Sequence, residues 1–450
     1  MAITTENKLR SALQDAGNPM QCLMFEWAKD APYNALHIVE CQGEFHLDAW
    51  QSALAEVIST LNYPLLVPFQ KPLQKIEKSS GNLIDLIQHE LNRPFAPDDF
   101  PFRGFMSPAG PERFYFGLAY SHWVADSVAM RLLMKNLMLT LNHQTLHIAP
   151  VDQPPANFLQ HYRRDLGGLS TWQLWLSALK HTLHYKGAFR TPMREVTDYT
   201  CGYSITRLPS DLLPALRRAI KLEGVAVNDA FIAALSRVLG EFWTHHRQKF
   251  PDKWGRKGRH RIAIGTIADI RTPDLNQTFG QYLGSYTVMT SDPEKMSLPR
   301  LLQQVATQTR QLKSEHRASR SHRVWRIALQ CWQREHRPEK NARFFMKSTP
   351  IMAGLSNVNL DACEHTQALS QMTGALQPLA YWRVSPTGPL LPLVFTLTTY
   401  QGELSLGVTY RRTAYSSDDI HRLVGSFIAS LQDYCATVEC RGESQDVLVT

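Results

Sequence analysis

Apolar residues recur along the chain with two different periods. Apolar and polar positions alternate over residues 113–120 and 404–410, which is typical of strands with one buried face. Helical spacing predicts helices over 48–62, with Asp48 as N-cap, and over 418–437. Further strands are expected over 34–41, 261–267, 351–358 and 390–397, and further helices over 83–91, 128–141, 225–244 and 301–317. Strands and helices are mixed throughout, which indicates an α/β or α+β fold.

The composition fits a globular protein. Of 450 residues, 44% are hydrophobic and 20% are charged, which excludes disordered, collagen-like and coiled-coil chains. The length fits up to three domains, or two large lobes that share one site. No apolar run approaches the ~20 residues that span a bilayer. The N-terminus lacks a basic stretch followed by an apolar core, so no signal peptide is expected and the default location is cytoplasmic.

Positive charge is concentrated in one segment. Residues 310–347 contain eleven Lys or Arg and three Glu, a net charge of +8, which equals the net charge of the whole chain. Such a face attracts a phosphate-bearing ligand, an acidic protein, nucleic acid or an anionic membrane. The alternative is a solvated helix face. Nucleic acid is not expected, because no nucleic-acid-binding module is recognisable.

His122 and Asp126 are the candidate catalytic residues. They follow the strand predicted over 113–120 and precede the helix predicted over 128–141, a connection of the kind where functional residues concentrate. A histidine there can act as a general base near pH 7. The alternatives are a hydrogen-bonded loop histidine and an aspartate that caps the helix. No metal site is expected, because the pair His245–His246 lacks a third ligand nearby.

The motif Ser121-His-Trp-Val-Ala-Asp126 resembles the hallmark of the chloramphenicol-acetyltransferase-like superfamily. This superfamily includes condensation domains of nonribosomal peptide synthetases, polyketide-associated acyltransferases and wax ester synthases. Weaker similarities follow in order along most of the chain, at 41–50, 91–95, 101–103, 227–232, 268–271, 279–284, 356–358 and 399–406. The motif Asp-Phe-Gly-Trp-Gly of the plant branch is absent.

The resemblance implies a two-layer α+β fold with two similar lobes. These lobes form a pseudo-dimer with a tunnel between them. We expect an N-terminal lobe over 1–170 that carries the motif, a crossover over 171–205 and a C-terminal lobe over 206–450.

The resemblance also implies an acyltransferase without a covalent acyl-enzyme. His122 would act as base toward a hydroxyl or amine that attacks a thioester, which gives an ester or an amide. The thioester donor would be a phosphopantetheine arm of a carrier protein met in trans, or coenzyme A as in wax-ester enzymes. Asp126 would be structural and pair with an arginine, Arg271 in preference to Arg103. No tightly bound cofactor is expected, and the chain is expected to be a monomer.

Two further groups of residues are expected at the site. Substrate contacts or oxyanion donors are expected from Ser121, Trp123, Ser127, Ser356, Asn357 and the backbone amides after His122. The carrier protein or coenzyme A is expected to meet Arg317, Arg320, Arg323 and Arg326. Ser121 stands where many condensation domains have a second histidine, and Ser127 where most relatives have glycine. These departures favour a second hypothesis, a non-catalytic member of the fold that docks a carrier protein.

Overall fold

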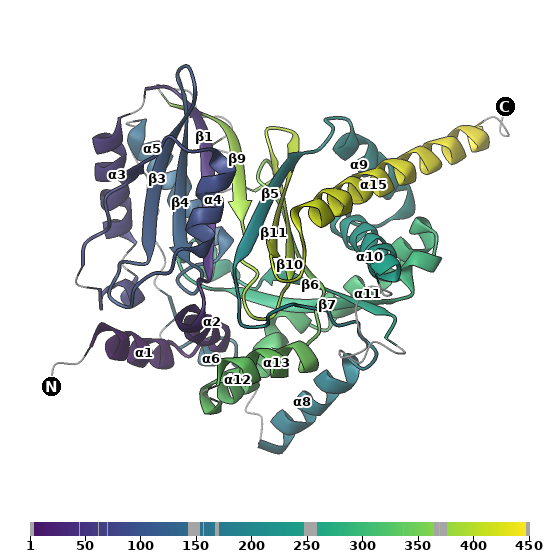
Figure 1. Ribbon diagram of the computed structural model, residues 1–450, viewed down its shortest axis with the longest axis horizontal. Helices are drawn as coiled ribbons and strands as arrows, with labels where there is room; N and C mark the ends of the chain where they lie inside the picture. The colour runs from purple at the N-terminus through teal and green to yellow at the C-terminus, as the bar shows by residue number, and fades with distance from the viewer. Residues whose placement is uncertain are drawn as a thin grey trace.

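The computed structural model describes residues 4–44, 46–61, 63–69, 71–142, 154–155, 157–166, 171–246, 259–335, 337–363, 369 and 376–446. It contains two β-sheets that lie side by side, each covered by helices (Figure 1). This arrangement agrees with the predicted mixture of strands and helices in two lobes. Among the described residues, no helix combines the length and the apolar character that crossing a membrane requires.

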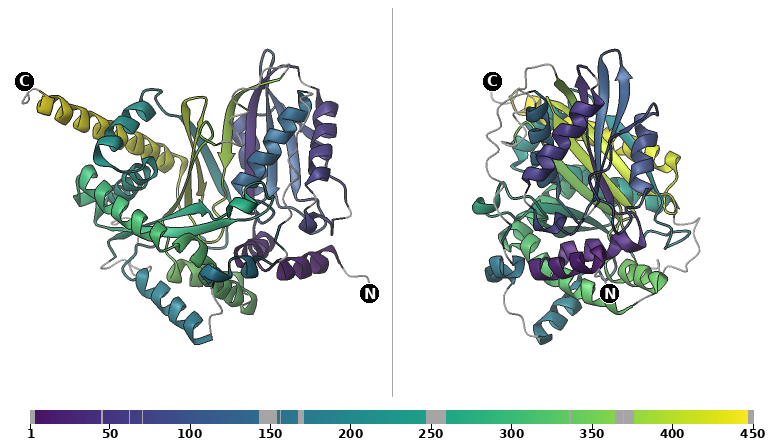
Figure 2. Two further views of the ribbon diagram at one scale, coloured as in Figure 1. Left: turned by 180° about the vertical axis from the view of Figure 1, so that it is seen from behind. Right: turned by 90° about the vertical axis from the view of Figure 1, so that its left-hand side faces the viewer.

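The first sheet has five strands in the order β2-β3-β4-β1-β9. They are β1 (Asn34–Gln42), β2 (Glu77–Lys78), β3 (Phe102–Gly110), β4 (Arg113–Ser121) and β9 (Gln377–Val384). Helices α3 (Leu47–Thr60) and α5 (Ser127–Leu141) pack against each other on one face, whereas α4 (Leu83–Asn92) lies on the other (Figures 1 and 2). The side chains of the four long strands point alternately to these two faces, and both faces are largely buried there, whereas both residues of β2 are exposed.

The second sheet has six strands in the order β5-β11-β10-β8-β6-β7. They are β5 (Cys201–Arg207), β6 (Arg261–Asp269), β7 (Leu283–Ser291), β8 (Ala353–Asn359), β10 (Leu393–Tyr400) and β11 (Glu403–Arg411). Strand β8 runs parallel to β10 and β6, and the other pairs are antiparallel. This sheet is covered by α9 (Leu212–Glu223), α10 (Val227–His246), α11 (Leu298–Ser314) and α15 (Ser417–Asp446).

The remaining helices gather below the two sheets in Figure 1. Among them, α12 packs against α2, β7 and α8. Their bounds are α1 (Thr5–Ala16), α2 (Pro19–Asp30), α6 (Phe158–His161), α7 (Arg163–Leu166), α8 (Thr171–His184), α12 (Arg317–Arg334) and α13 (Pro338–Ser348), with short 3-10 turns η1 (Pro64–Leu66), η4 (Pro273–Leu275) and η5 (Pro293–Lys295).

Strand β9 joins the two lobes. It pairs with β1 in the first sheet, although it comes from the segment 206–450 that was assigned to the second lobe. The chain then passes over residues 385–392 to β10 in the second sheet. Strand β5 in turn begins at Cys201, within the predicted crossover 171–205. The lobe boundaries remain a prediction. Because β9 lies in the first sheet but follows most of the second lobe in sequence, no single position along the chain separates the two lobes.

Most predicted elements are confirmed to within a few residues, including β1, β4, α5, α10, β11 and the start of α15. One cap is wrong. Asp48 lies in the first turn of α3, and the N-cap is His46, which makes no side-chain capping bond. An aspartate in the first turn is still favourable, because its charge meets the positive end of the helix dipole.

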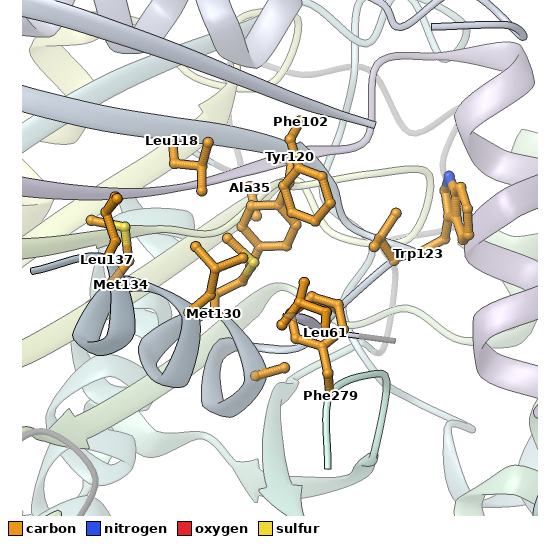
Figure 3. Packing of buried hydrophobic residues seen from close by; sticks show 14 of the residues in the cluster. Ala35, Leu61, Phe102, Leu118, Tyr120, Trp123, Met130, Met134, Leu137 and Phe279 are labelled. Atoms are coloured by element: carbon orange, nitrogen blue, oxygen red, sulfur yellow. The ribbon is translucent and has the colours of Figure 1, made fainter. Parts of the chain in front are cut away.

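The core of the first lobe is closely packed (Figure 3). Met130, Met134 and Leu137 of α5 lie under Leu118 and Tyr120 of β4, and all five are 0–1% exposed. We therefore expect Leu137→Ala to lower the free energy of unfolding by about 2–5 kcal/mol, because it leaves a cavity that close packing cannot refill. Urea unfolding followed by circular dichroism measures this change.

The matched control is Leu222→Ala, at a residue of α9 that is 74% exposed. It should change the free energy of unfolding by no more than about 0.5 kcal/mol. Equal effects of the two substitutions would contradict the packing described here.

Candidate active site

The segment His122–Asp126 connects the end of β4 to the start of α5 and is held at both ends by backbone hydrogen bonds. The His122 N–H donates to the carbonyl oxygen of Tyr33 (2.8 Å), which lies just before β1. The Asp126 N–H donates to the carbonyl oxygen of Gly280 (3.0 Å), which belongs to the second half of the chain. The connection is therefore fixed between two distant segments.

The ring of His122 is half-buried and lies between two tyrosines. Tyr33 stacks on it with ring centroids 5.5 Å apart, and Tyr120 packs edge-on at 5.8 Å. Burial lowers the pKa of His122 below its ordinary value, and the nearby carbonyl of Ala125 and charge of Asp126 oppose this only in part. His122 is therefore neutral at pH 7 and can accept a proton.

The hydrogen bond of Nδ1 determines the tautomer of His122. Nδ1 lies 3.2 Å from the carbonyl oxygen of Ala125, and a carbonyl oxygen can only accept. The proton therefore lies on Nδ1, and the lone pair lies on Nε2. The amide nitrogen of Gln281 lies 3.4 Å from Nδ1, but it donates to Ala125 O (2.8 Å) and to His122 O, so it does not change this assignment.

Asp126 is the capping residue of α5 and one half of a buried ion pair. Its Oδ1 accepts from the N–H groups of Val128 (2.9 Å) and Ala129 (3.0 Å). Its Oδ2 accepts from the N–H of Tyr282 (2.7 Å) and lies 2.8 Å from Nη1 of Arg271. The side chains of Asp126 and Arg271 are 0% and 1% exposed. A carboxylate so fully occupied, and so buried, holds the connection in position.

Arg271, and not Arg103, is the partner of Asp126. Arg271 also contacts Asp269 (3.1 Å) and lies over the ring of Tyr282. Burial alone would lower the pKa of Arg271, but the charges of Asp126 and Asp269 outweigh it and raise this pKa. Arg103 is paired with Glu90 on α4 instead (2.8 Å). The ion pair therefore joins the motif of the first lobe to the second lobe.

Gly280 allows the two lobes to approach here. Its φ is +141°, a conformation that other L residues rarely adopt, and a side chain would press on Tyr63 and Tyr282. The carbonyl oxygen of Gly280 is the acceptor for Asp126 N, and the next residue is Gln281. The segment 278–282 thus holds the motif through main-chain and side-chain contacts.

Ser127 and Ser356, both predicted substrate contacts, are brought together by Arg383 of β9. Nη1 of Arg383 donates to the hydroxyl oxygens of Ser127 (3.4 Å) and Ser356 (3.1 Å). Sequence reasoning missed Arg383 and Gln281. The sequence contains a signal for each. Arg383 is the single charged residue in the apolar stretch 379–384, and Gln281 lies in a segment that carries the family resemblance.

The structure places the other predicted substrate contacts outside the group around Arg383. They are Ser121, Trp123 and Asn357. Ser121 is buried at the end of β4, and its N–H donates to Pro101 O (3.1 Å). Trp123 is 4% exposed and packs against Phe25 and Phe69 in the core of the first lobe (Figure 3). Asn357 is half-buried on β8 and points to the face opposite Ser356, because neighbouring strand residues alternate.

Some of the backbone N–H groups after His122, which are expected as oxyanion donors, already donate hydrogen bonds within the fold. The N–H groups of Val124 and Asp126 donate to carbonyl groups of the fold, at 3.0 Å each. These two amides therefore cannot serve a reaction intermediate. The hydroxyl protons of Ser127 and Ser356 remain available, because both oxygens act as acceptors toward Arg383.

The four arginines of the predicted carrier or coenzyme A contact lie on α12. Arg317, Arg320 and Arg326 are exposed, and Arg317 is paired with Glu315 (2.7 Å). Arg323 is half-buried and donates to the carbonyl oxygen of Asp165. Three of the four are thus exposed, and the fourth anchors α12 to α7.

We expect Asp126→Asn to lower the free energy of unfolding by about 3–5 kcal/mol, because the buried Arg271 loses its buried carboxylate and keeps the partly exposed Asp269. The asparagine oxygen can still cap α5, so the loss reports on the ion pair. Chemical denaturation measures it. Asp269→Asn is the control: that side chain is 41% exposed, and its loss should cost about 1 kcal/mol or less. A similar small cost for both variants would contradict this role of Asp126.

No protein-family model and no curated protein sequence matches the chain. Solved structures do. The crystal structure of holo-AB3403, a four-domain nonribosomal peptide synthetase bound to AMP and glycine, is 16% identical with a TM-score of 0.64, over 94% of this chain and 33% of that chain. The condensation domain of the monacolin K polyketide synthase MokA is 11% identical with a TM-score of 0.61, over 96% and 97%.

The X-domain from teicoplanin biosynthesis, in its complex with OxyB, is 14% identical with a TM-score of 0.59, over 94% and 93% of the two chains. The present chain therefore spans about a third of the length of the four-domain synthetase but nearly all of the two single domains. At these identities the likeness shows the fold. The protein has the two-lobed, chloramphenicol-acetyltransferase-like fold of the condensation domains.

Proposed function

We propose that the protein is an acyltransferase of the condensation-domain type. It transfers an acyl group from a phosphopantetheine thioester on a carrier protein to a hydroxyl or amine acceptor. The observation that carries this proposal is a neutral histidine with a free Nε2, held at the lobe interface by the Asp126–Arg271 pair. Several solved structures of this fold are themselves parts of peptide or polyketide synthases, which supports a biosynthetic role.

The reaction follows from the chemistry of His122. Nε2 removes the proton of the acceptor O–H or N–H as that atom attacks the thioester carbonyl. The carbon–sulfur bond of the resulting tetrahedral intermediate then breaks. The departing thiolate takes the proton from Nε2, so His122 returns to its neutral form. Asp126 takes no part in proton transfer, since every position around its carboxylate is filled by a donor of the fold.

The exposed arginines Arg317, Arg320 and Arg326 are suited to steer a negatively charged donor toward the protein. A carrier protein and coenzyme A both carry negative charge, so these residues support a thioester donor of either kind. A coenzyme A-dependent enzyme of the wax-ester type is therefore the alternative within the same reaction class.

A docking function without catalysis is the second candidate. It is favoured by Ser127, which stands beside the motif where the resembling enzymes have glycine, and by the X-domain, whose structure was solved as a complex with OxyB. It predicts carrier binding that does not depend on His122, with no product from any thioester.

We expect His122→Ala to lower the rate of acyl transfer by about 10²–10⁴-fold, since the general base is lost, while the fold is kept. Intact-protein mass spectrometry of an acyl-loaded carrier protein, incubated with a pool of alcohols and amines, follows the loss of acyl mass. The same assay is repeated with acyl-coenzyme A donors. His89→Ala, at an exposed histidine of α4, is the control and should keep full activity.

Two results would contradict the proposal. Undiminished transfer by His122→Ala would exclude this histidine as the base. No acyl loss from any donor with the unmodified protein would favour the docking function.

The pH dependence tests the state of His122. Because burial places its pKa below the ordinary value of 6.5, the neutral base is present above the shifted pKa and is lost as the pH falls through it. We expect kcat/KM to be constant from pH 7 to 8 and to fall on acidification, with a midpoint below 6.5. A midpoint above 6.5 would show that His122 is protonated more easily than its surroundings imply.

A further inference from the structure

Two buried arginines lie close to the His122–Asp126 connection, and neither has an acidic partner among the residues that the structure describes. Arg383 of β9 is 3% exposed and Arg131 of α5 is 6% exposed. Within the described part of the chain, their hydrogen-bond partners are hydroxyls, carbonyl groups and one thiol. By contrast, the buried Arg103 and Arg271 each meet a carboxylate. A buried cation is costly unless an opposite charge accompanies it.

The two guanidinium groups converge on Ser127, the first residue of α5. Nε of Arg131 donates to the carbonyl oxygen of Ser127 (3.0 Å), and Nη1 of Arg383 donates to its hydroxyl (3.4 Å). Burial and the charge of Arg131 lower the pKa of Arg383 to about 9, so Arg383 is still a cation at pH 7. Two positive charges are therefore buried close to each other.

No neighbouring group of the described residues compensates these charges. Burial raises the pKa of Tyr120 and of Tyr381, so both are neutral phenols. His37 lies opposite Arg383 in the β1–β9 pair. Its pKa is lowered well below the ordinary value, by burial first and then by the charges of Arg383 and Arg131, so it is neutral too. Arg411 differs from these two arginines. It is a single buried arginine, and the charges of Asp198 and Glu195 favour its cationic form.

The cluster offers donors for which the described residues supply no acceptor. A guanidinium group has five N–H donors. Arg131 uses Nε and Nη1, toward Ser127 and the sulfur of Cys363 (3.0 Å), and its Nη2 has no partner among the described residues. The hydroxyls of Ser127 and Ser356 accept from Arg383, so their own protons point away from it.

This cluster adjoins the catalytic histidine. The ring of Tyr120 lies 6.0 Å from that of His37 and 5.8 Å from that of His122. The charges of Arg131 and Arg383 both act on His37. A ligand on the arginines would therefore lie within one small molecule's length of the reacting atoms.

The geometry points to a carboxylate-binding site formed by Arg131, Arg383, Ser127 and Ser356, so that one substrate of the enzyme carries a carboxylate. The inference rests on the proposed acyl transfer only in calling this ligand a substrate. A planar carboxylate matches the fork of a guanidinium and accepts from hydroxyls at the same time.

The test is calorimetric titration with acetate, propionate and benzoate, and with the corresponding amides, at constant ionic strength. We expect the carboxylates to bind at least tenfold more tightly than the amides. Arg383→Met and Arg131→Met should each weaken carboxylate binding at least tenfold, whereas Arg237→Met, at a surface ion pair of α10, and His122→Ala should not. If Arg383→Met does not fold, Arg131→Met decides, because it loses only two hydrogen bonds.

Equal binding of carboxylates and amides, no binding of any carboxylate, tighter binding of inorganic phosphate, or unchanged binding by both arginine variants would each overturn the site. The acyl-transfer assay separates the two proposals. Carboxylate binding with the expected dependence on the arginines, but without turnover, leaves the site and overturns the proposed function. Turnover that treats carboxylate-bearing acceptors and acyl groups like the corresponding amides leaves the function and overturns the site.

Discussion

The ion pair between Asp126 and Arg271 is the contact on which the arrangement of the site depends. Both side chains are essentially excluded from water. The pair joins the connection between β4 and α5 in the first lobe to the residues that follow β6 in the second. Burying two charges costs free energy that their attraction returns only when the geometry is good and the remaining hydrogen bonds are made. Here those bonds are made, since Asp126 also accepts three backbone N–H groups. The pair is therefore better understood as a device that fixes the relative position of the lobes than as a source of net stability.

The position of His122 follows from this contact. With Asp126 fixed, the carbonyl of Ala125 is placed against Nδ1, and the amide of Gln281 closes the same turn from the second lobe. The tautomer with an unprotonated Nε2 is thus set by main-chain geometry. Strand β9 adds a further element from the distant part of the chain, because it carries Arg383 to the start of α5. Both the proposed general base and the proposed carboxylate site are completed only when the lobes are together.

Much of this could be predicted from the sequence, because it depends on local pattern. Alternation identified β4 and β11, and the motif placed His122 and Asp126 on a connection between strand and helix. The resemblance favoured Arg271, but only contacts separated by 145 positions along the chain could exclude Arg103, which Glu90 holds. Strand β9 was not predicted, because its partner β1 lies more than three hundred residues away and both of its faces are buried. Trp123 was expected at the substrate but belongs to the core, since α2 covers it.

The contact between the lobes fixes the turn that holds the proton of His122 on Nδ1, and burial keeps the ring neutral. Nitrogen-15 NMR of histidine-labelled protein at pH 7 tests it most directly, with His122→Ala used to assign the signals and Arg271→Met to remove the contact. The account predicts a protonated Nδ1 and an unprotonated Nε2 in the unmodified protein, and loss of this single form in Arg271→Met. A proton on Nε2 in the unmodified protein, or an identical spectrum in Arg271→Met, would contradict it.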